Sequence, residues 1–252
     1  MLEKSINGLT IKYDYAYKQK LVDGEYVDDT TQKIVKINDV QTNETNVVFP
    51  DCIDGYPITI FEKHVLENNQ IIETVILPEY LEELRDYDFA NCQNLKSIKF
   101  PESLKFVGYQ VFRNCTALLS IDLSSQELNL GGLAFADCTS LNNINLSDDI
   151  FMVNTKALHN TAYFNDEKNW TDGVLYIGNH LIYSRNTTPV YKVRDGTVSI
   201  ASYAFENNFT VSRVIVPKTL KTIGYRAFCD KFVSFGGERC PAFNEEIEYD
   251  IF

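Results

Sequence analysis

The sequence repeats itself with a period of 23 residues. Segments 72–94, 95–117 and 118–140 follow one pattern, L-x-x-I-x-(I/F/L)-P-x-x-L-x-x-(I/V/L)-G-x-x-(A/V)-F-x-(N/D)-C-x-x. One column of large apolar residues holds Leu66, Phe89, Phe112, Phe135, Leu158, Phe205 and Phe228. A second column, five positions earlier, holds Phe61, Leu84, Val107, Leu130, Val153, Ile200 and Ile223. Because two independent columns keep the same phase, the chain is predicted to stack short coils around one continuous core.

A single repeat unit indicates how each coil is built. Ile98 and Phe100 alternate with polar residues, as in a short strand with one buried side. Pro101 ends the strand, because proline has no N–H to donate to a β-ladder. Gly108 permits a tight corner on the return path, and Phe112 closes the core. A coil this short cannot bury its apolar side alone, so several coils must stack and the ends need caps.

These residues resemble the BspA-like leucine-rich repeat family, whose pattern is close to LxxIxIPxxLxxIGxxAFxxC. The match covers roughly residues 49–231, with departures at Arg85, Ser124, Ser147, Asn154 and Lys231. The resemblance implies a β-rich repeat solenoid, a right-handed leucine-rich-repeat coil with short parallel strands on one face. It also implies a bacterial protein, extracellular or on the cell surface, that makes adhesive contacts. The first residues carry no hydrophobic leader, so a native start at Met1 would instead place the chain in the cytoplasm.

The phase of the repeat divides the chain into segments. The expected segments are an N-terminal β-rich cap at 1–60, regular 23-residue repeats at 61–160, an irregular repeat with a β-hairpin insertion at 161–199, resumed repeats at 200–231, and a C-terminal cap or tail at 232–252. A cap is needed because the first coil would otherwise expose its apolar end and a free strand edge. Val153 and Ile200 are two periods and one residue apart, which leaves two arrangements open: one distorted coil with a loop, or one coil and an insertion.

A β-hairpin is predicted inside the irregular segment. Two apolar runs, 174–177 and 180–183, flank Gly178-Asn179, and such a pair between such runs indicates a hairpin turn. The aromatic side chains around it either project as a contact surface or pack across the interrupted coil, and we expect packing. This set comprises Trp170, Tyr176, Tyr183 and Tyr191. Core or cap packing is likewise expected for the stripe Tyr13, Tyr15 and Tyr17.

The candidate binding residues lie between the inward positions of the strands, where side chains must face outward. The central outward position holds Ile76, Lys99, Asp122, Asn145 and Ile215. The position two residues earlier holds Ser97, Ser120, Asn143 and Arg213. The family resemblance implies that partners bind on such a sheet face. The alternative interpretation is a solvated sheet surface that binds nothing.

Composition and motifs argue against several other functions. The net charge of −12 and pI of about 4.7 disfavour nucleic acid and anionic membrane surfaces as partners. No apolar run approaches the ~18 residues that a membrane-spanning helix needs. The histidines His64, His159 and His180 do not stand at metal-ligand spacing, and no nucleotide-binding or hydrolase motif occurs. We therefore expect no catalytic residue, no cofactor and no metal.

Three cysteines, Cys92, Cys115 and Cys138, share one position of the repeat. Their side chains should stack in parallel, and this geometry is poor for a disulfide, so buried free thiols are predicted. Cys229 and Cys240 lie outside that column, and pairing between them stays open.

The sequence favours a non-catalytic recognition module that binds a protein, such as a host matrix or surface protein, or a glycan, through its parallel sheet face. One alternative is a structural spacer or assembly unit of a larger surface protein. Another is a hydrolase or a glycan-active enzyme that would use the acids of the irregular segment, Asp166 and Glu167. Adjacent acids in a loop are usually solvated, so we do not expect this activity.

Overall fold

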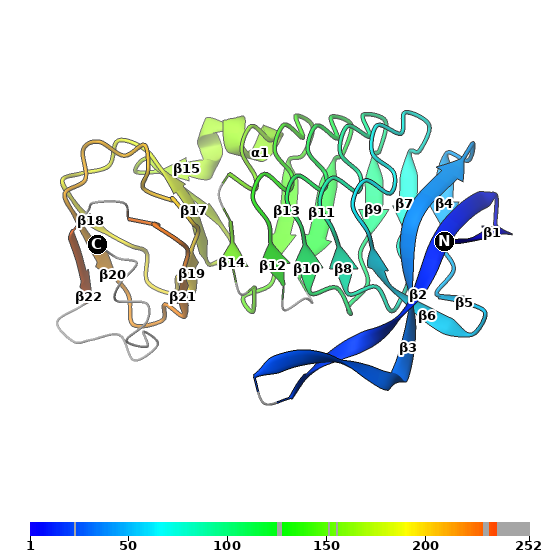
Figure 1. Cartoon of the computed structure of the whole chain (residues 1–252). Helices are drawn as coiled ribbons and strands as arrows, with labels where there is room; N and C mark the ends of the chain where they lie inside the picture. The colour runs from blue at the N-terminus through cyan, green and yellow to red at the C-terminus, as the bar shows by residue number, and fades with distance from the viewer. Residues whose placement is uncertain (23, 125–127, 151, 155, 229–231, 236–252) are drawn as a thin grey trace.

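The structure, a computed structural model, describes residues 1–252 with the exception of 23, 125–127, 151, 155, 229–231 and 236–252. Within these residues the chain forms a β-solenoid of about eight turns, with mostly parallel strands and little helix. Figure 1 shows the regular coils side by side, from β4 (Asn46–Val48) to β14 (Met152–Val153). The prediction of a β-rich leucine-rich-repeat solenoid is confirmed.

The first strand of each regular coil lies on one side of the solenoid. These strands are β4, β7 (Thr74–Ile76), β9 (Ser97–Lys99), β11 (Ser120–Leu123) and β13 (Asn143–Leu146). β4, β7 and β9 pair in parallel, as do β11 and β13. The backbone N–H of Leu119 donates to the Lys96 carbonyl over 3.2 Å, so β9 and β11 are also neighbours. We call the outward surface of these five strands the outer face.

A second parallel ladder faces the first across the core. It joins β6 (Tyr56–Phe61), β8 (Glu83–Leu84), β10 (Phe106–Val107), β12 (Asn129–Leu130) and β14. Leu84, Val107 and Leu130 point inward from it and are fully buried. The sequence indicated only a return path here, because strands of two residues are too short to show an alternating pattern.

The large apolar column forms a continuous stack of rings. Phe89, Phe112 and Phe135 are fully buried, and their centroids lie 5.2 Å and 4.9 Å apart along the column. The rings are nearly parallel, with interplanar angles of 15° and 7°. The stack confirms that successive coils share one interior.

The Asn or Asp of the repeat occupies a left-handed backbone conformation. The φ angles of Asn91 and Asn114 are 62° and 61°, a region that asparagine tolerates better than most residues. Their side chains also form a ladder, because Asn114 Nδ2 donates to Asn91 Oδ1, and Asn91 Nδ2 donates to Asn68 Oδ1, both over 2.9 Å. This position therefore turns each coil and joins it to the previous one.

The cysteine column is buried and unbridged, as the sequence predicted. Cys92, Cys115 and Cys138 are free thiols, and each Sγ–H donates to a backbone carbonyl at 3.0 to 3.2 Å. Burial raises the pKa of Cys92 to about 12. Cys229 and Cys240 lie outside the described residues.

The N-terminal strands cover the first coil. β1 (Leu2–Ile6), β2 (Leu9–Val22) and β3 (Glu25–Thr42) form an antiparallel meander, and β3 then pairs in parallel with β6. β5 (Cys52–Ile53) pairs with β6 in antiparallel orientation. In the tyrosine stripe, the hydroxyls of Tyr13 and Tyr15 donate to Asp54, whereas Tyr17 is 39% exposed. Packing thus accounts for the first two tyrosines.

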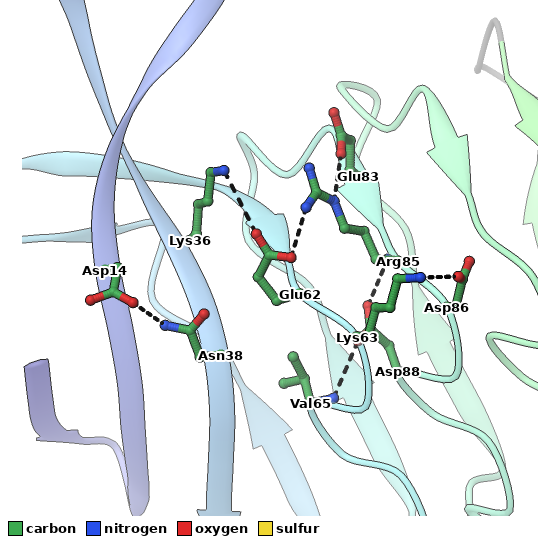
Figure 2. Close-up of polar contacts among 10 residues, drawn as sticks. All are labelled: Asp14, Lys36, Asn38, Glu62, Lys63, Val65, Glu83, Arg85, Asp86 and Asp88. Atoms are coloured by element: carbon green, nitrogen blue, oxygen red, sulfur yellow. Dashed lines mark hydrogen bonds and ion pairs between the residues drawn. The ribbon is translucent and has the colours of Figure 1, made fainter. Parts of the chain in front are cut away.

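Charged side chains fasten β3 to the first coils, as Figure 2 shows. Lys36 Nζ lies 3.7 Å from Glu62, whose second oxygen lies 2.7 Å from Arg85. Arg85 also contacts Glu83 at 3.0 Å. Every charge in this group has a partner of opposite sign, so the group joins elements of the fold.

The buried carboxyl of Asp88 completes this junction (Figure 2). It accepts hydrogen bonds from the backbone N–H of Val65 at 3.2 Å and of Arg85 at 2.8 Å. Burial raises the pKa of Asp88 well above its ordinary value. Later coils place Val111, Ala134 and Ala157 at this position, so Asp88 is a local replacement for an apolar core residue.

The predicted hairpin is present and divides the core. β16 (Val174–Ile177) and β17 (His180–Ser184) pair in antiparallel orientation, preceded by α1 (Ala162–Asn165), η1 (Glu167–Asn169) and β15 (Trp170–Thr171). Leu175 and Ile177 belong to the core of the preceding coils, whereas Val174 and Tyr176 belong to the core of the following coils. A strand buried on both faces reads as a continuous apolar run, which explains this sequence. β17 pairs in parallel with β19 (Ser199–Ile200), so the hairpin leads directly into the sheet of the following coils.

The aromatic side chains near the hairpin pack, as expected. Trp170 and Tyr183 contact the first core cluster, and Tyr176 and Tyr191 contribute to the second. Beyond the hairpin, the outer strands are β18 (Val190–Lys192), β20 (Arg213–Val216) and β22 (Phe232–Phe235), and β21 (Thr222–Ile223) pairs in parallel with β19.

Candidate functional site

The outer face gathers seven of the nine candidate binding residues. Strand register places Ile76 opposite Lys99, and Asp122 opposite Asn145, so these four side chains form one row across β7 to β13. A parallel row holds Ser97, Ser120 and Asn143. All seven residues are exposed. The 23-residue spacing brings them together because each coil repeats the same strand one step along the axis.

Arg213 and Ile215 lie on a different sheet, formed by β18, β20 and β22. In the coil after β13, the helical turns α1 and η1 stand where an outer strand would continue the face. The outer face therefore ends at β13. The sequence did not indicate this division, because the strand pattern alone does not show which coil loses its outer strand.

The outer face contains an open groove of about 810 Å³ over β7 and β9. Its floor includes Ile76, Ile98 and Lys99, and Asp122 of β11 lies at one side. The loops that follow the strands form its rim and contribute Glu79, Tyr80 and Glu102. Ile76 is 42% exposed and Tyr80 is 47% exposed, so the groove presents apolar surface beside its charges.

The groove is rich in carboxylates. Asp51, Glu79, Glu102 and Asp122 line it, against the single ammonium group of Lys99. Within the described part of the chain none of these five groups forms an ion pair. Hydrogen bonds from Ser124 and Asn145 hold the pKa of Asp122 below its ordinary value, so this carboxylate is charged at neutral pH.

Three acids that line the groove do not occupy outward strand positions. Asp51, Glu79 and Glu102 each follow a proline directly, after Pro50, Pro78 and Pro101. Because proline ends the strand at the same point in each coil, an acidic residue after proline recurs in neighbouring loops. Glu79 also donates its backbone N–H to Asp51 over 2.8 Å, which joins the first two loops. The Pro-acid pairs were a sequence signal for this rim.

Asp166 and Glu167, the candidate catalytic acids, have structural partners, as does the nearby Asp148. The Asp166 side chain caps η1 by accepting a hydrogen bond from the Lys168 N–H at 3.1 Å, and Glu167 pairs with Arg185. Asp148 accepts hydrogen bonds from Asn179 at 3.0 and 3.2 Å. These contacts fix loops around the hairpin.

The three histidines lie in separate places. His64 contacts Glu67 at 2.6 Å and stacks on Tyr87, and His159 packs against Phe164. His180 is fully buried, with Nε2 at 2.9 Å from the Ser147 carbonyl and Nδ1 at 2.7 Å from Ser199 Oγ. Because a carbonyl only accepts, Nε2 carries the proton and Nδ1 accepts from the serine. Among the described residues no group of three or more potential metal ligands occurs.

A second hollow of about 440 Å³ lies over the asparagine ladder and is lined by Tyr87, Asn91, Arg113 and Asp137 among others. Its main charges are paired, since Arg113 lies 3.2 Å from Asp137. Among the described residues, no helix has both the length and the apolar character required to span a bilayer.

Comparison with known proteins agrees with this architecture. The model of the BspA type leucine-rich repeat region matches residues 59–188 and 176–235, with six copies of the repeat. No curated protein matches the chain. The leucine-rich repeat protein TpLRR of T. pallidum superposes with a TM-score of 0.51 and 17% identity, over 86% of this chain and 87% of that one, which shows a shared fold.

Two other solved structures resemble the chain more loosely. A leucine rich cell surface protein from Faecalibacterium prausnitzii A2-165 gives a TM-score of 0.47 at 17% identity, over 93% of this chain and 76% of that one. The pneumococcal vaccine antigen PcpA gives 0.44 at 17% identity, over 93% and 70%.

The family match covers well over half of the chain, and its boundaries enclose both the regular coils and the coils after the hairpin. The ring stack, the second ladder and the asparagine ladder follow the same period. The chain belongs to the BspA-type leucine-rich repeat family.

Proposed function

We propose that this chain is a non-catalytic recognition module that binds a protein partner across its outer face, with the groove over β7 and β9 as the centre of contact. The observation that carries the proposal is that groove's set of unpaired charges beside exposed apolar side chains. In the network of Figure 2, by contrast, Lys36, Glu62 and Arg85 are paired with one another within the fold. Exposed apolar surface next to unpaired charge is typical of a protein interface.

We further propose that the module acts at a bacterial cell surface, in adhesion to a host matrix or surface protein. The family supports a repeat module for protein binding, and the F. prausnitzii protein is described as a cell surface protein. A rigid row of coils suits this role, because its strands hold the contact residues in fixed register.

Site-specific photo-crosslinking tests the proposal. Benzoylphenylalanine replaces Tyr80 in one protein and Phe106 in another, which keeps an aromatic side chain at both positions. Phe106 is 38% exposed on the second ladder, so it is a matched control on the opposite side of the core. The probes are a panel of purified extracellular matrix proteins and intact host cells.

The proposal expects covalent adducts with a protein from position 80 and none from position 106. Adducts at equal yield from the two positions, or at neither, contradict recognition through the outer face. A spacer without a selective partner predicts that second result.

A further inference from the structure

We propose that the groove over β7 and β9 selects an extended segment in which an arginine or lysine stands beside an aliphatic side chain. The inference rests on the proposed function and specifies the chemistry of the partner. Three properties of the groove carry it: the sign of its charge, the position of its apolar surface, and the absence of a free strand edge at its floor.

The charge of the groove calls for a basic partner. Four carboxylates and one ammonium line it, so its formal charge is negative, in a chain whose net charge is −12. In the described residues the carboxylates of Glu79 and Glu102 have neither an ion-pair nor a hydrogen-bond partner. A cationic side chain of a partner could therefore form ion pairs with these carboxylates. An acidic partner would be repelled.

The apolar surface of the groove lies next to these acids. Ile76 of β7 and Ile98 of β9 make part of the floor apolar. Tyr80 lies on the rim, directly after Glu79 in the chain. A guanidinium group can stack on a tyrosine ring while its N–H groups bond a carboxylate. An aliphatic neighbour in the same segment would cover Ile76. This arrangement favours arginine over lysine at the charged position.

A partner can contact the floor of the groove through side chains but not through backbone hydrogen bonds. β7 is hydrogen-bonded to β4 and to β9, and the far edge of β9 lies beside β11, where the Leu119 N–H donates to the Lys96 carbonyl, so these edges already face neighbouring strands. A partner strand therefore cannot extend the sheet at this point, and specificity depends on side-chain contacts. The partner segment is expected to lie across the rows and to present its side chains to the floor.

Selection from a library of random 12-residue peptides, displayed on phage and panned against the full chain, tests the inference. The enriched peptides are synthesised, and their dissociation constants are measured by fluorescence polarisation. The protein variants are Glu79→Gln with Glu102→Gln, and Tyr80→Ala. The matched control is Glu25→Gln with Glu44→Gln, which removes the same charge from exposed residues away from the groove. Thermal unfolding of each variant checks that it is folded.

The inference expects enriched peptides with an arginine or lysine next to Leu, Ile or Val. The Glu79 and Glu102 variant should weaken their binding about tenfold or more, Tyr80→Ala about fivefold, and the control less than twofold. Replacing the arginine by citrulline, which removes its charge, should weaken binding to wild type but not to the double variant.

Two kinds of result overturn the inference, and they differ in what they mean for the proposed function. Peptides that lose affinity with Tyr80→Ala but carry no basic residue would place recognition in the groove and refute the basic partner. Enrichment of acidic peptides, binding that all variants retain, or no enrichment would refute the groove chemistry. In those cases the crosslinking at position 80 still decides independently whether the outer face binds protein.

Discussion

The aromatic rings of Phe112 and Phe135 lie almost parallel, with centroids 4.9 Å apart and planes inclined by 7°. Phe89 stacks on Phe112 as well, at 5.2 Å and 15°. The three residues come from three successive coils, so each ring contacts the coil before it or after it. The continuity of the core depends on this column.

Truncation in the middle of the column should be costly. Phe112→Ala removes a fully buried ring and leaves a cavity, and we expect a loss of about 3–5 kcal/mol in the free energy of unfolding. Urea denaturation followed by circular dichroism measures this value. Phe106→Ala, at an exposed position of the same coil, is the control and should cost less than about 1 kcal/mol. Equal effects of the two changes would contradict the stacked core.

The buried carboxyl of Asp88 should make stability fall as pH rises. Burial raises the pKa of Asp88 in the folded chain above its unfolded value, so the folded state holds the proton more tightly. Its contribution is therefore complete at pH values below the unfolded pKa, and it decreases as pH rises through the folded pKa.

Asp88→Ala isolates this contribution, because other acids titrate equally in both proteins. The variant leaves the N–H groups of Val65 and Arg85 without this acceptor, so it should be less stable than wild type at acidic pH. The deficit should shrink as pH rises, as seen in urea denaturation at several pH values. A deficit that grows with pH would show that the carboxylate is stabilising in its charged form.

The buried His180 should make the stability of the fold decrease as the pH falls. Desolvation lowers the pKa of His180, with Asp148 and Lys221 acting in opposite directions on it, so the folded state favours the neutral ring. Stability from this group is present above the unfolded pKa and is lost as pH falls through the folded pKa. As the pH falls below about 6.5, wild type should lose more stability than His180→Gln, as measured by urea denaturation at several pH values. The same loss in both proteins would refute this assignment, since His64 and His159 are common to them.

The exposed cysteine should react with a thiol reagent faster than the buried cysteines. Cys52 is exposed, whereas Cys92, Cys115 and Cys138 are buried. Brief treatment of the native protein with iodoacetamide, followed by peptide mass spectrometry, should modify Cys52 and leave the three column thiols intact. In denaturant all four should react. Modification of Cys115 in the native protein at the rate of Cys52 would contradict the closed core.

The sequence predicted the fold well where a physical requirement recurs in every coil. The Phe column must be apolar in each coil, so it was visible in the sequence, and so was the hairpin through Gly178-Asn179. The second ladder was not visible, because pairs such as Phe106-Val107 are too short to show alternation.

The candidate binding surface was less predictable than the core. Outward positions of a strand follow from the inward ones, which placed Ile76, Lys99 and Asp122 correctly on one face. The position of Tyr80 beside the groove depends on how a loop bends over the sheet. The separation of Arg213 from the outer face depends on helical turns that replace one strand. Both are tertiary effects that the period of the repeat does not encode.

The most direct test of recognition through the outer face uses a partner identified by crosslinking. Its affinity is measured for the double variant that carries both Lys99→Ala and Asp122→Ala. These two residues lie in the groove, and their exposed side chains leave the core unchanged. Asn129→Ala on the second ladder is the control. The account predicts that the double variant binds about tenfold or more weakly while the control binds as wild type does. Unchanged affinity of the double variant, with the partner still bound, would contradict it.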